Sequence, residues 1–387
     1  MSVKSRYGRR VSRRNVLRGM AAGALGLAGA ALIGCGGEDE VKATPTTAPA
    51  RSTPAVKATA APTAPPTPTP KARATRGQIF VFSNSSPHIS VIDTVSQKVT
   101  KTADVPEFTS WAWNDDNNHA EGNVLWLGMR NPTTSDAFVV TLDMEKVEVT
   151  KRIPIGKENL TLYIGKAAKD GTLHVGKQGA QQVAVIDTKA GTLKDTWSPP
   201  VNGDVVCDAD VSTDARGVER FVYPTRRGDT IVTLDPKTGT VLKEVPTPKG
   251  STPLMLSTGP DGRIWVQDSG SNTNSVYDPI ELKELARFPS GTGPVVNSFS
   301  PDGKLTYVGH SADTIVQVID TATYREVKRI TAGTNPQKLA VHPDGSKIYA
   351  ILTRDGAVAV IDTKSWEVAE RVSLGTNPNG IYLRGLA

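Results

Sequence analysis

Seven aspartates recur along the chain at intervals of 42 to 50 residues, and regularly spaced carboxylates could serve metal binding or acid–base chemistry. Each one closes an alternating apolar run, and most are followed by Thr or Pro. At such a transition from strand to turn, the carboxylate accepts hydrogen bonds from backbone N–H groups. One aspartate per repeated unit also cannot converge on a single site. We therefore predict that these residues cap turns: Asp93, Asp143, Asp187, Asp235, Asp278, Asp320 and Asp362.

The densest acidic cluster lies around Cys207 and comprises Asp204, Asp208, Asp210 and Asp214. Calcium loops need oxygen ligands on a tight turn that contains Gly. In this cluster the alternation of Asp208 and Asp210 instead places both on one face of a strand beside a channel. A polar channel wall is the favoured interpretation, and a metal site at Asp208 and Asp210 is the weaker alternative.

The five histidines show no HxH, HExxH or CxxCH spacing, which argues against zinc, copper and covalent haem. His174 takes an aromatic position and is predicted to lie in the core, whereas His310 ends a strand near a channel mouth. No Ser/His/Asp order or phosphate-binding Gly-rich loop stands out. No catalytic residue can therefore be assigned and no cofactor is evident, although a bound metal ion is left open.

The elements that carry these residues form a repeat, which is clearest between Ser300 and Leu374. Two copies of one unit lie end to end there, each with a Pro-Asp-Gly turn and two alternating runs. Alternation of apolar and polar residues, interrupted by turns that contain Gly, Pro and Asp, is typical of short antiparallel strands. A repeat of this length with about four strands predicts a propeller blade.

Seven such units are present. In six of them a large apolar residue or His stands 13 positions before the repeated Asp. In the second unit the spacing from Trp126 to Asp143 is 17, which predicts a four-residue insertion within Asn131–Phe138. The sequence therefore predicts an all-β, seven-bladed β-propeller of four-stranded antiparallel blades. The six residues that stand 13 positions before the repeated Asp are Phe80, His174, Val222, Trp265, Tyr307 and Tyr349.

The repeat resembles the YVTN-type β-propeller repeat family of extracytoplasmic and surface proteins. The matching residues run from Tyr307-Val308-Gly309-His310 to Val318-Ile319-Asp320-Thr321 and recur in the next blade. The resemblance implies seven blades. Such propellers serve as scaffolds, binding proteins and enzymes, so the resemblance implies little about chemistry.

The two ends of the repeat region are complementary. The run Gln78–Ser83 corresponds to a second strand and no first strand precedes it, whereas residues 377–384 correspond to a first strand that no second strand follows. We therefore predict that the C-terminal strand completes blade one and closes the ring, which leaves no exposed sheet edge there.

The N-terminal segment is predicted to be a targeting sequence and not part of the folded domain. Residues 12–18, which include Arg13 and Arg14, resemble the twin-arginine export signature, and residues 32–35 resemble a bacterial lipobox that ends at Cys35. That resemblance implies that Cys35 is lipidated. We expect a signal peptide over 1–34, a Pro/Thr/Ala-rich disordered tether over 35–77 and the propeller over 78–387.

The net charge of +6 comes from the N-terminal part. Residues 78–387 hold 32 Lys and Arg against 36 Asp and Glu, a net charge of −4. This balance argues against nucleic acid as a partner. Because Cys35 and Cys207 are the two cysteines of the chain, the propeller contains one thiol and no internal disulfide.

Residues just after each second strand, and those that enter each first strand, should crowd one mouth of the channel. Their types vary between blades, and the arginines among them suggest an anionic group on the ligand. The candidates are Arg130, Lys177, Asp204, Arg226, Arg227, Asp268, His310, Gln337, Arg354 and Asn379.

The sequence thus favours an extracytoplasmic lipoprotein, anchored to the cell membrane, whose propeller acts as a binding or scaffolding module. Its expected partners are the membrane, through the lipid, and a protein or small anionic ligand at the mouth, with the propeller monomeric. The alternative is an extracytoplasmic enzyme with its site at the mouth, either a lactonase-like metal hydrolase or a cofactor-bearing oxidoreductase.

Overall fold

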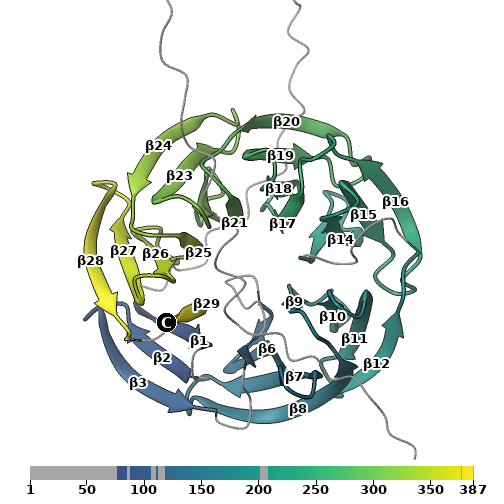
Figure 1. Cartoon of the computed structure of the whole chain (residues 1–387), viewed down its shortest axis with the longest axis horizontal. Helices are drawn as coiled ribbons and strands as arrows, with labels where there is room; N and C mark the ends of the chain where they lie inside the picture. Colours follow the sequence, from purple (N-terminus) through teal and green to yellow (C-terminus); the bar gives the residue numbers. More distant parts are fainter. Residues whose placement is uncertain are drawn as a thin grey trace, which may run out of the picture. The chain divides into compact units, whose positions relative to one another are not determined.

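The computed structural model describes residues 76–84, 88–105, 110–111, 118–200, 208–375 and 377–386. In this part of the chain seven antiparallel sheets are arranged as a ring around a central channel, so the predicted seven-bladed β-propeller is confirmed (Figure 1). The predicted signal, lipobox and tether, with Arg13, Arg14 and Cys35, lie outside the described residues, as do Asp204 and Cys207. None of the described segments forms a helix that could cross a bilayer.

Each blade contains four strands, which follow one another from the channel to the outer rim. Blade 1 contains β29 (Pro378–Leu386), β1 (Arg76–Ser83), β2 (His88–Asp93) and β3 (Lys98–Asp104). Blade 2 contains β4 (Ser110–Trp111), β6 (Val124–Arg130), β7 (Asp136–Asp143) and β8 (Glu148–Lys157), and β5 (Ala120–Glu121) also pairs with β6. Blade 3 contains β9 (Leu162–Ile164), β10 (Thr172–Lys177), β11 (Gln182–Asp187) and β12 (Thr192–Trp197).

The remaining blades follow the same order. Blade 4 contains β13 (Asp210–Thr213), β14 (Glu219–Thr225), β15 (Thr230–Leu234) and β16 (Val241–Pro246). Blade 5 contains β17 (Pro253–Thr258), β18 (Ile264–Asp268), β19 (Thr273–Tyr277) and β20 (Glu284–Pro289). Blade 6 contains β21 (Pro294–Phe299), β22 (Leu305–His310), β23 (Ile315–Asp320) and β24 (Glu326–Thr331). Blade 7 contains β25 (Pro336–Val341), β26 (Lys347–Leu352), β27 (Ala357–Asp362) and β28 (Glu367–Ser373).

The burial of a strand depends on its distance from the channel. In blade 7 the middle strands β26 and β27 are buried along nearly their whole length, whereas the outer strand β28 is mostly exposed. A middle strand is covered on both faces by neighbouring blades, so its sequence is a continuous apolar run. The outer strand lies at the rim, which explains why charged residues alternate there.

The seven repeated aspartates cap the turns between third and fourth strands, as predicted. Each carboxylate accepts hydrogen bonds from the backbone amides two and three residues later, for example those of Lys364 and Ser365 at Asp362. The residue four positions after each Asp has a positive φ. A register shift follows in every one of these strand pairs, as in hairpins that combine a turn with a bulge. The positive-φ residues are Gln97, Val147, Gly191, Gly239, Leu282, Tyr324 and Trp366.

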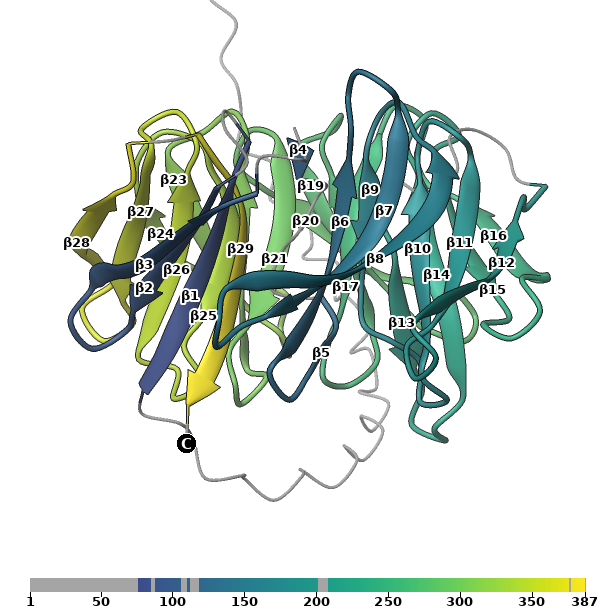
Figure 2. The same cartoon turned by 90° about the horizontal axis from the view of Figure 1, so that it is seen from below.

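The ring is closed by β29, which pairs antiparallel with β1 from Arg76↔Leu386 to Ser83↔Pro378. Figure 2 shows the two strands side by side. Ile381 and Leu383 of β29 are buried in a core that also contains residues of blades 1 and 7. The predicted closure is therefore confirmed, with β1 beginning two residues earlier than the predicted Gln78.

Candidate binding site at the channel mouth

The aligned residues at one end of the second strands are all buried. Their side chains pack inside and between blades, so packing also constrains their types and accounts for part of the variation between blades. In six blades the aligned residue ends the strand, and in blade 2 the strand continues one residue further, to the half-buried Arg130. The seven residues are Ser83, Met129, Lys177, Thr225, Asp268, His310 and Leu352.

Asp268 ends β18 with its side chain fully buried. One carboxylate oxygen accepts hydrogen bonds from Ser275 Oγ and Arg287 Nη1, each at 2.7 Å, while Oδ1 has no partner among the described residues. Burial raises the pKa of Asp268 to about 6, against the opposing effects of the Ser275 and Arg287 contacts. Asp268 therefore forms part of the interior of blade 5.

His310 is also enclosed. Its Nδ1 lies 3.0 Å from the carbonyl oxygen of Ile315, and its Nε2 lies 3.0 Å from Ser290 Oγ. Burial lowers the pKa of His310, so the neutral ring is favoured. Both ring nitrogens have protein partners, which makes His310 part of the packing between blades 5 and 6.

Lys177 is 3% exposed, and its Nζ donates a hydrogen bond to Gln182 at 3.1 Å. Burial lowers the pKa of Lys177, and the charge of Glu158 opposes this shift. Glu158 accepts hydrogen bonds from the amides of Leu160, Gly179 and Ala180. It therefore joins the loop before β9 to the loop after β10, at the channel mouth where the second strands end.

Arg226 and Arg227 are exposed and line a pocket of 530 Å³ between blades 3 and 5. Arg226 has no hydrogen bond or ion pair with any described residue. Asp229 lies in the same pocket, but its carboxylate accepts hydrogen bonds from the amides of Gly250 at 2.7 Å and Thr252 at 2.8 Å. The pocket thus contains two exposed arginine residues, and its carboxylate is already hydrogen-bonded to backbone amides. The pocket is lined by Leu160, Gln178, Arg226, Arg227, Asp229 and Thr252.

Four further predicted residues do not line this pocket. Arg354 is exposed, and Arg130, Gln337 and Asn379 are half-buried. Of the nine predicted mouth residues that the structure describes, Arg226 and Arg227 lie in one pocket and the other seven lie outside it.

Asp208 and Asp210 connect the first strands of blades 4 and 5. The amide of Leu256 donates to Asp208 at 3.1 Å, and the amide and hydroxyl of Thr258 donate to Asp210 at 3.2 and 2.6 Å. Across the described ranges, no group of three or more His, Cys, Asp or Glu side chains is placed to hold a metal ion. Asp208 and Asp210 therefore link blade 4 to blade 5 through hydrogen bonds.

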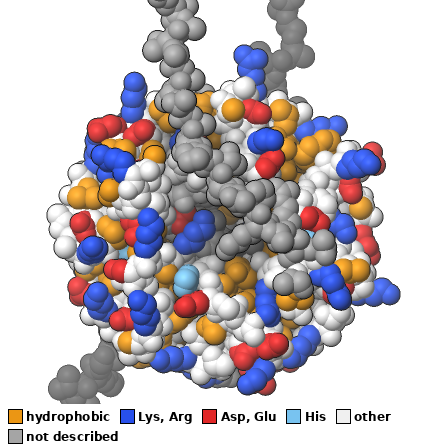
Figure 3. Space-filling model, turned by 180° about the vertical axis from the view of Figure 1, so that it is seen from behind, with side chains coloured by type: hydrophobic (Ala, Val, Ile, Leu, Met, Phe, Trp, Pro, Cys, Tyr) orange, Lys and Arg blue, Asp and Glu red, His pale blue; other side chains and the backbone are white. Residues whose placement is uncertain are grey.

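A second pocket lies where the first strands end, at the other mouth of the channel, and the sequence pattern does not predict it. Its polar groups are Lys166, Thr213, Thr258 and Ser298. Lys166 follows the short strand β9, and three hydroxyl residues at strand ends are not distinctive in a sequence rich in Ser and Thr. Figure 3 shows the face opposite to that of Figure 1, hollowed at its centre with charged side chains of both signs at the edge.

No family model and no curated protein match the sequence. Solved structures do match. A protein of Bacteroides uniformis described as a candidate 6-phosphogluconolactonase has a TM-score of 0.63 and 12% identity over 80% of this chain and 99% of its own. The periplasmic gluconolactonase PpgL of Pseudomonas aeruginosa has a TM-score of 0.61 and 17% identity, with coverages of 81% and 100%.

AztD of Citrobacter koseri is similar as well, with a TM-score of 0.56 and 14% identity over 81% of this chain and 98% of its own. At identities this low, such similarities establish the fold and not the activity. What these comparisons establish for this chain is a seven-bladed β-propeller.

Proposed function

We propose that this protein is an extracytoplasmic, lipid-anchored propeller that binds a small anionic ligand at the channel mouth formed by Arg226 and Arg227. The observation that carries the proposal is the 530 Å³ pocket, which holds two exposed guanidinium groups and one carboxylate already bound to backbone amides.

The size and charge of this pocket suit such a ligand. Its volume lies within the range of small-molecule sites, about 300–1,000 Å³. A guanidinium offers parallel N–H donors that match a carboxylate or phosphate. Arg226 has no competing partner among the described residues, so binding requires no ion pair of Arg226 to be broken.

The proposal is tested by calorimetric titration with 6-phosphogluconate, which carries both a phosphate and a carboxylate. The Arg226→Ala/Arg227→Ala variant should weaken binding roughly 10-fold or more, because charge-assisted hydrogen bonds are lost. Arg325→Ala is the matched control, since Arg325 is exposed in a turn at the other end of the strands. Equal binding by the double variant and the wild type would contradict the proposal.

The second candidate is an enzyme that hydrolyses a lactone at the same mouth. It is supported by the names of two structural neighbours, a candidate 6-phosphogluconolactonase and a periplasmic gluconolactonase. Acid release from 6-phosphogluconolactone in a pH-stat separates the two functions. Turnover that the double Arg variant abolishes would favour the enzyme, whereas binding of 6-phosphogluconate without turnover would favour the binding protein.

The proposed location depends on the N-terminal sequence, where the twin-arginine-like segment and the lipobox-like residues 32–35 precede the Pro/Thr/Ala-rich tether. In this proposal the diacylated Cys35 anchors the chain to the membrane and residues 36–77 link it to the propeller. The name of the periplasmic neighbour PpgL is consistent with an extracytoplasmic location.

A further inference from the structure

The second pocket lies at the ends of four successive first strands, and we propose that it binds a small hydroxylated carboxylate whose carboxylate group pairs with Lys166. It has a volume of 420 Å³. Blades 3 to 6 each contribute to it, together with the turn formed by residues 259–262. The side chains that carry the argument are Lys166, Val211, Thr213, Thr258, Ser298 and Phe299.

This pocket is separate from the pocket that Arg226 and Arg227 line. Thr213 ends β13 and is paired with Glu219 at the start of β14, whereas Arg226 follows the end of β14. Seven residues of extended chain separate these two positions, which corresponds to roughly 20 Å. The inference therefore does not depend on the proposed function.

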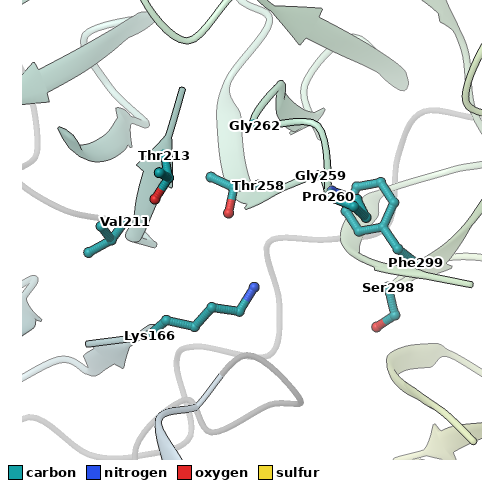
Figure 4. A pocket seen from close by; sticks show the side chains of 9 residues that line it. All are labelled: Lys166, Val211, Thr213, Thr258, Gly259, Pro260, Gly262, Ser298 and Phe299. Carbon is teal, nitrogen blue, oxygen red and sulfur yellow. The ribbon is translucent and has the colours of Figure 1, made fainter. Parts of the chain in front are cut away.

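Lys166 provides the charge. Figure 4 shows its side chain reaching into the space between Thr258 and Ser298. Lys166 has no hydrogen bond or ion pair with any described residue. The carboxylate of Asp210 accepts hydrogen bonds from Val211 and Thr258 and does not pair with Lys166. Lys166 supplies one positive charge, which balances a singly charged carboxylate but only half the charge of a phosphate dianion.

The hydroxyl groups of Thr258 and Ser298 define which polar groups the ligand must carry beside its carboxylate. Thr258 Oγ1 donates its proton to Asp210 at 2.6 Å, and Ser298 Oγ donates to the carbonyl oxygen of Leu339 at 3.1 Å. Each hydroxyl has one proton, so both oxygens offer the pocket only lone pairs. A ligand must therefore donate hydrogen bonds to them, as alcohol groups do.

An amino group could also donate these hydrogen bonds, but a second ammonium would then share the cavity with Lys166. The repulsion between like charges favours a neutral hydroxyl over an amine. Thr213 has no side-chain partner among the described residues and can donate to the carboxylate. Val211 and Phe299 provide apolar surface for a short carbon chain.

The experiment titrates the full-length protein with glycerate, whose two hydroxyls match the two acceptors, with propionate, which lacks them, and with alanine. Glycerate should bind most tightly. Lys166→Met should weaken glycerate binding roughly 10-fold or more, because an ionic hydrogen bond is lost, and Lys166→Arg should retain part of the binding. The matched control is Lys304→Met, since the Lys304 side chain is 81% exposed and ion-paired with Asp302.

Ser298→Ala adds a second readout. It removes an acceptor, so it should weaken glycerate binding and leave propionate binding unchanged. The proposal is overturned if glycerate does not bind, if propionate or alanine binds as tightly, or if Lys304→Met has the effect expected of Lys166→Met. The Arg226→Ala/Arg227→Ala variant should bind glycerate normally, which separates this site from the first one.

Discussion

The carboxylate of Asp210 in β13 accepts hydrogen bonds from both the amide and the hydroxyl of Thr258 in β17, a strand of the next blade. No strand pairing joins these two first strands. Ser257 Oγ similarly donates to the carbonyl oxygen of Asn297 in β21, and Ser298 Oγ to that of Leu339 in β25. Around this part of the channel, hydrogen bonds from side chains thus replace the backbone hydrogen bonds that would join strands of one sheet. They pair the backbone N–H and C=O groups at the strand edges.

Asp210→Ala should lower the free energy of unfolding by about 1–3 kcal/mol, because the buried Thr258 donors lose their acceptor. Urea unfolding measures the change. The exposed Asp195 is a suitable control, and Asp195→Ala should stay within about 0.5 kcal/mol of wild type. If EDTA destabilised the wild type but not Asp210→Ala, Asp210 would hold a metal ion instead.

Removing residues 378–387 should open the ring. The deletion takes away the buried Ile381 and Leu383 and leaves the inner edge of β1 unpaired. Each of these side chains contributes about 1.5–3 kcal/mol, so the loss should exceed about 3 kcal/mol and promote aggregation. Thermal melting and light scattering test this, and a deletion of residues 43–70 in the proposed tether should change neither. An unchanged melting temperature after the C-terminal deletion would contradict the role of β29.

Cys35→Ser should abolish membrane attachment. A diacyl group supplies membrane affinity that the weakly apolar segment before Cys35 lacks. The expected result is that the variant takes up no labelled fatty acid and leaves the membrane fraction, while the wild type does the reverse. Ser12→Ala, within the same leader, is a control that should still be labelled. Membrane-bound Cys35→Ser protein together with unlabelled wild type would refute the lipoprotein proposal.

The contribution of Asp268 to stability should fall as the pH rises through the titration of this carboxyl group. The folded-state pKa is about 6 and the ordinary value is 3.8, so between these values the folded protein holds a proton that the unfolded chain has released. The stabilisation is complete below pH 3.8, declines up to about pH 6 and is then lost, with a total of about 3 kcal/mol.

Asp268→Asn cannot ionise, so the difference in the free energy of unfolding between the wild type and this variant should show the decline when both are unfolded in urea from pH 4.5 to 7.5. His174, whose pKa burial lowers to about 4, acts in the opposite direction within this window, but it is present in both proteins. Asp214, whose pKa is lowered to about 2, also acts in the opposite direction but below this window. Parallel pH profiles for the wild type and Asp268→Asn would show that Asp268 is ionised throughout.

Gly239→Ala should destabilise the protein more than Gly191→Ala, although both residues occupy the same turn position with positive φ. Each substitution costs about 1–2 kcal/mol for a left-handed conformation. A Cβ at Gly239 would also lie 2.4 Å from the Trp197 ring, whereas one at Gly191 meets only the flexible end of Lys151. Equal melting temperatures for the two variants would contradict the packing of Trp197 on Gly239.

The architecture could be predicted because it depends on local rules that repeat. The number of repeated aspartates predicts the number of blades, and the interval between them predicts the length of each blade. The unmatched strand at each end of the repeat region predicts that the ring is closed by pairing of these two strands. The mouth was harder to predict because strand position alone does not tell whether a side chain turns into a blade or towards solvent. Lys177, Asp268 and His310 turn inwards, while Arg226 one residue beyond β14 is exposed. The Lys166 pocket depends on four blades meeting in space, which no local pattern reports.

Closure by β29 has a consequence for how the protein is made. Among the described strands β29 is the last along the chain and β1 the first, so during synthesis on the ribosome β1 emerges long before its partner. Blade 1 therefore stays one strand short until translation has passed residue 386, and the loop that must close spans all the other blades, which slows folding. During that interval the edge of β1 can accept the β29 of a second chain, so crowded polysomes are where we expect strand exchange between copies to arise.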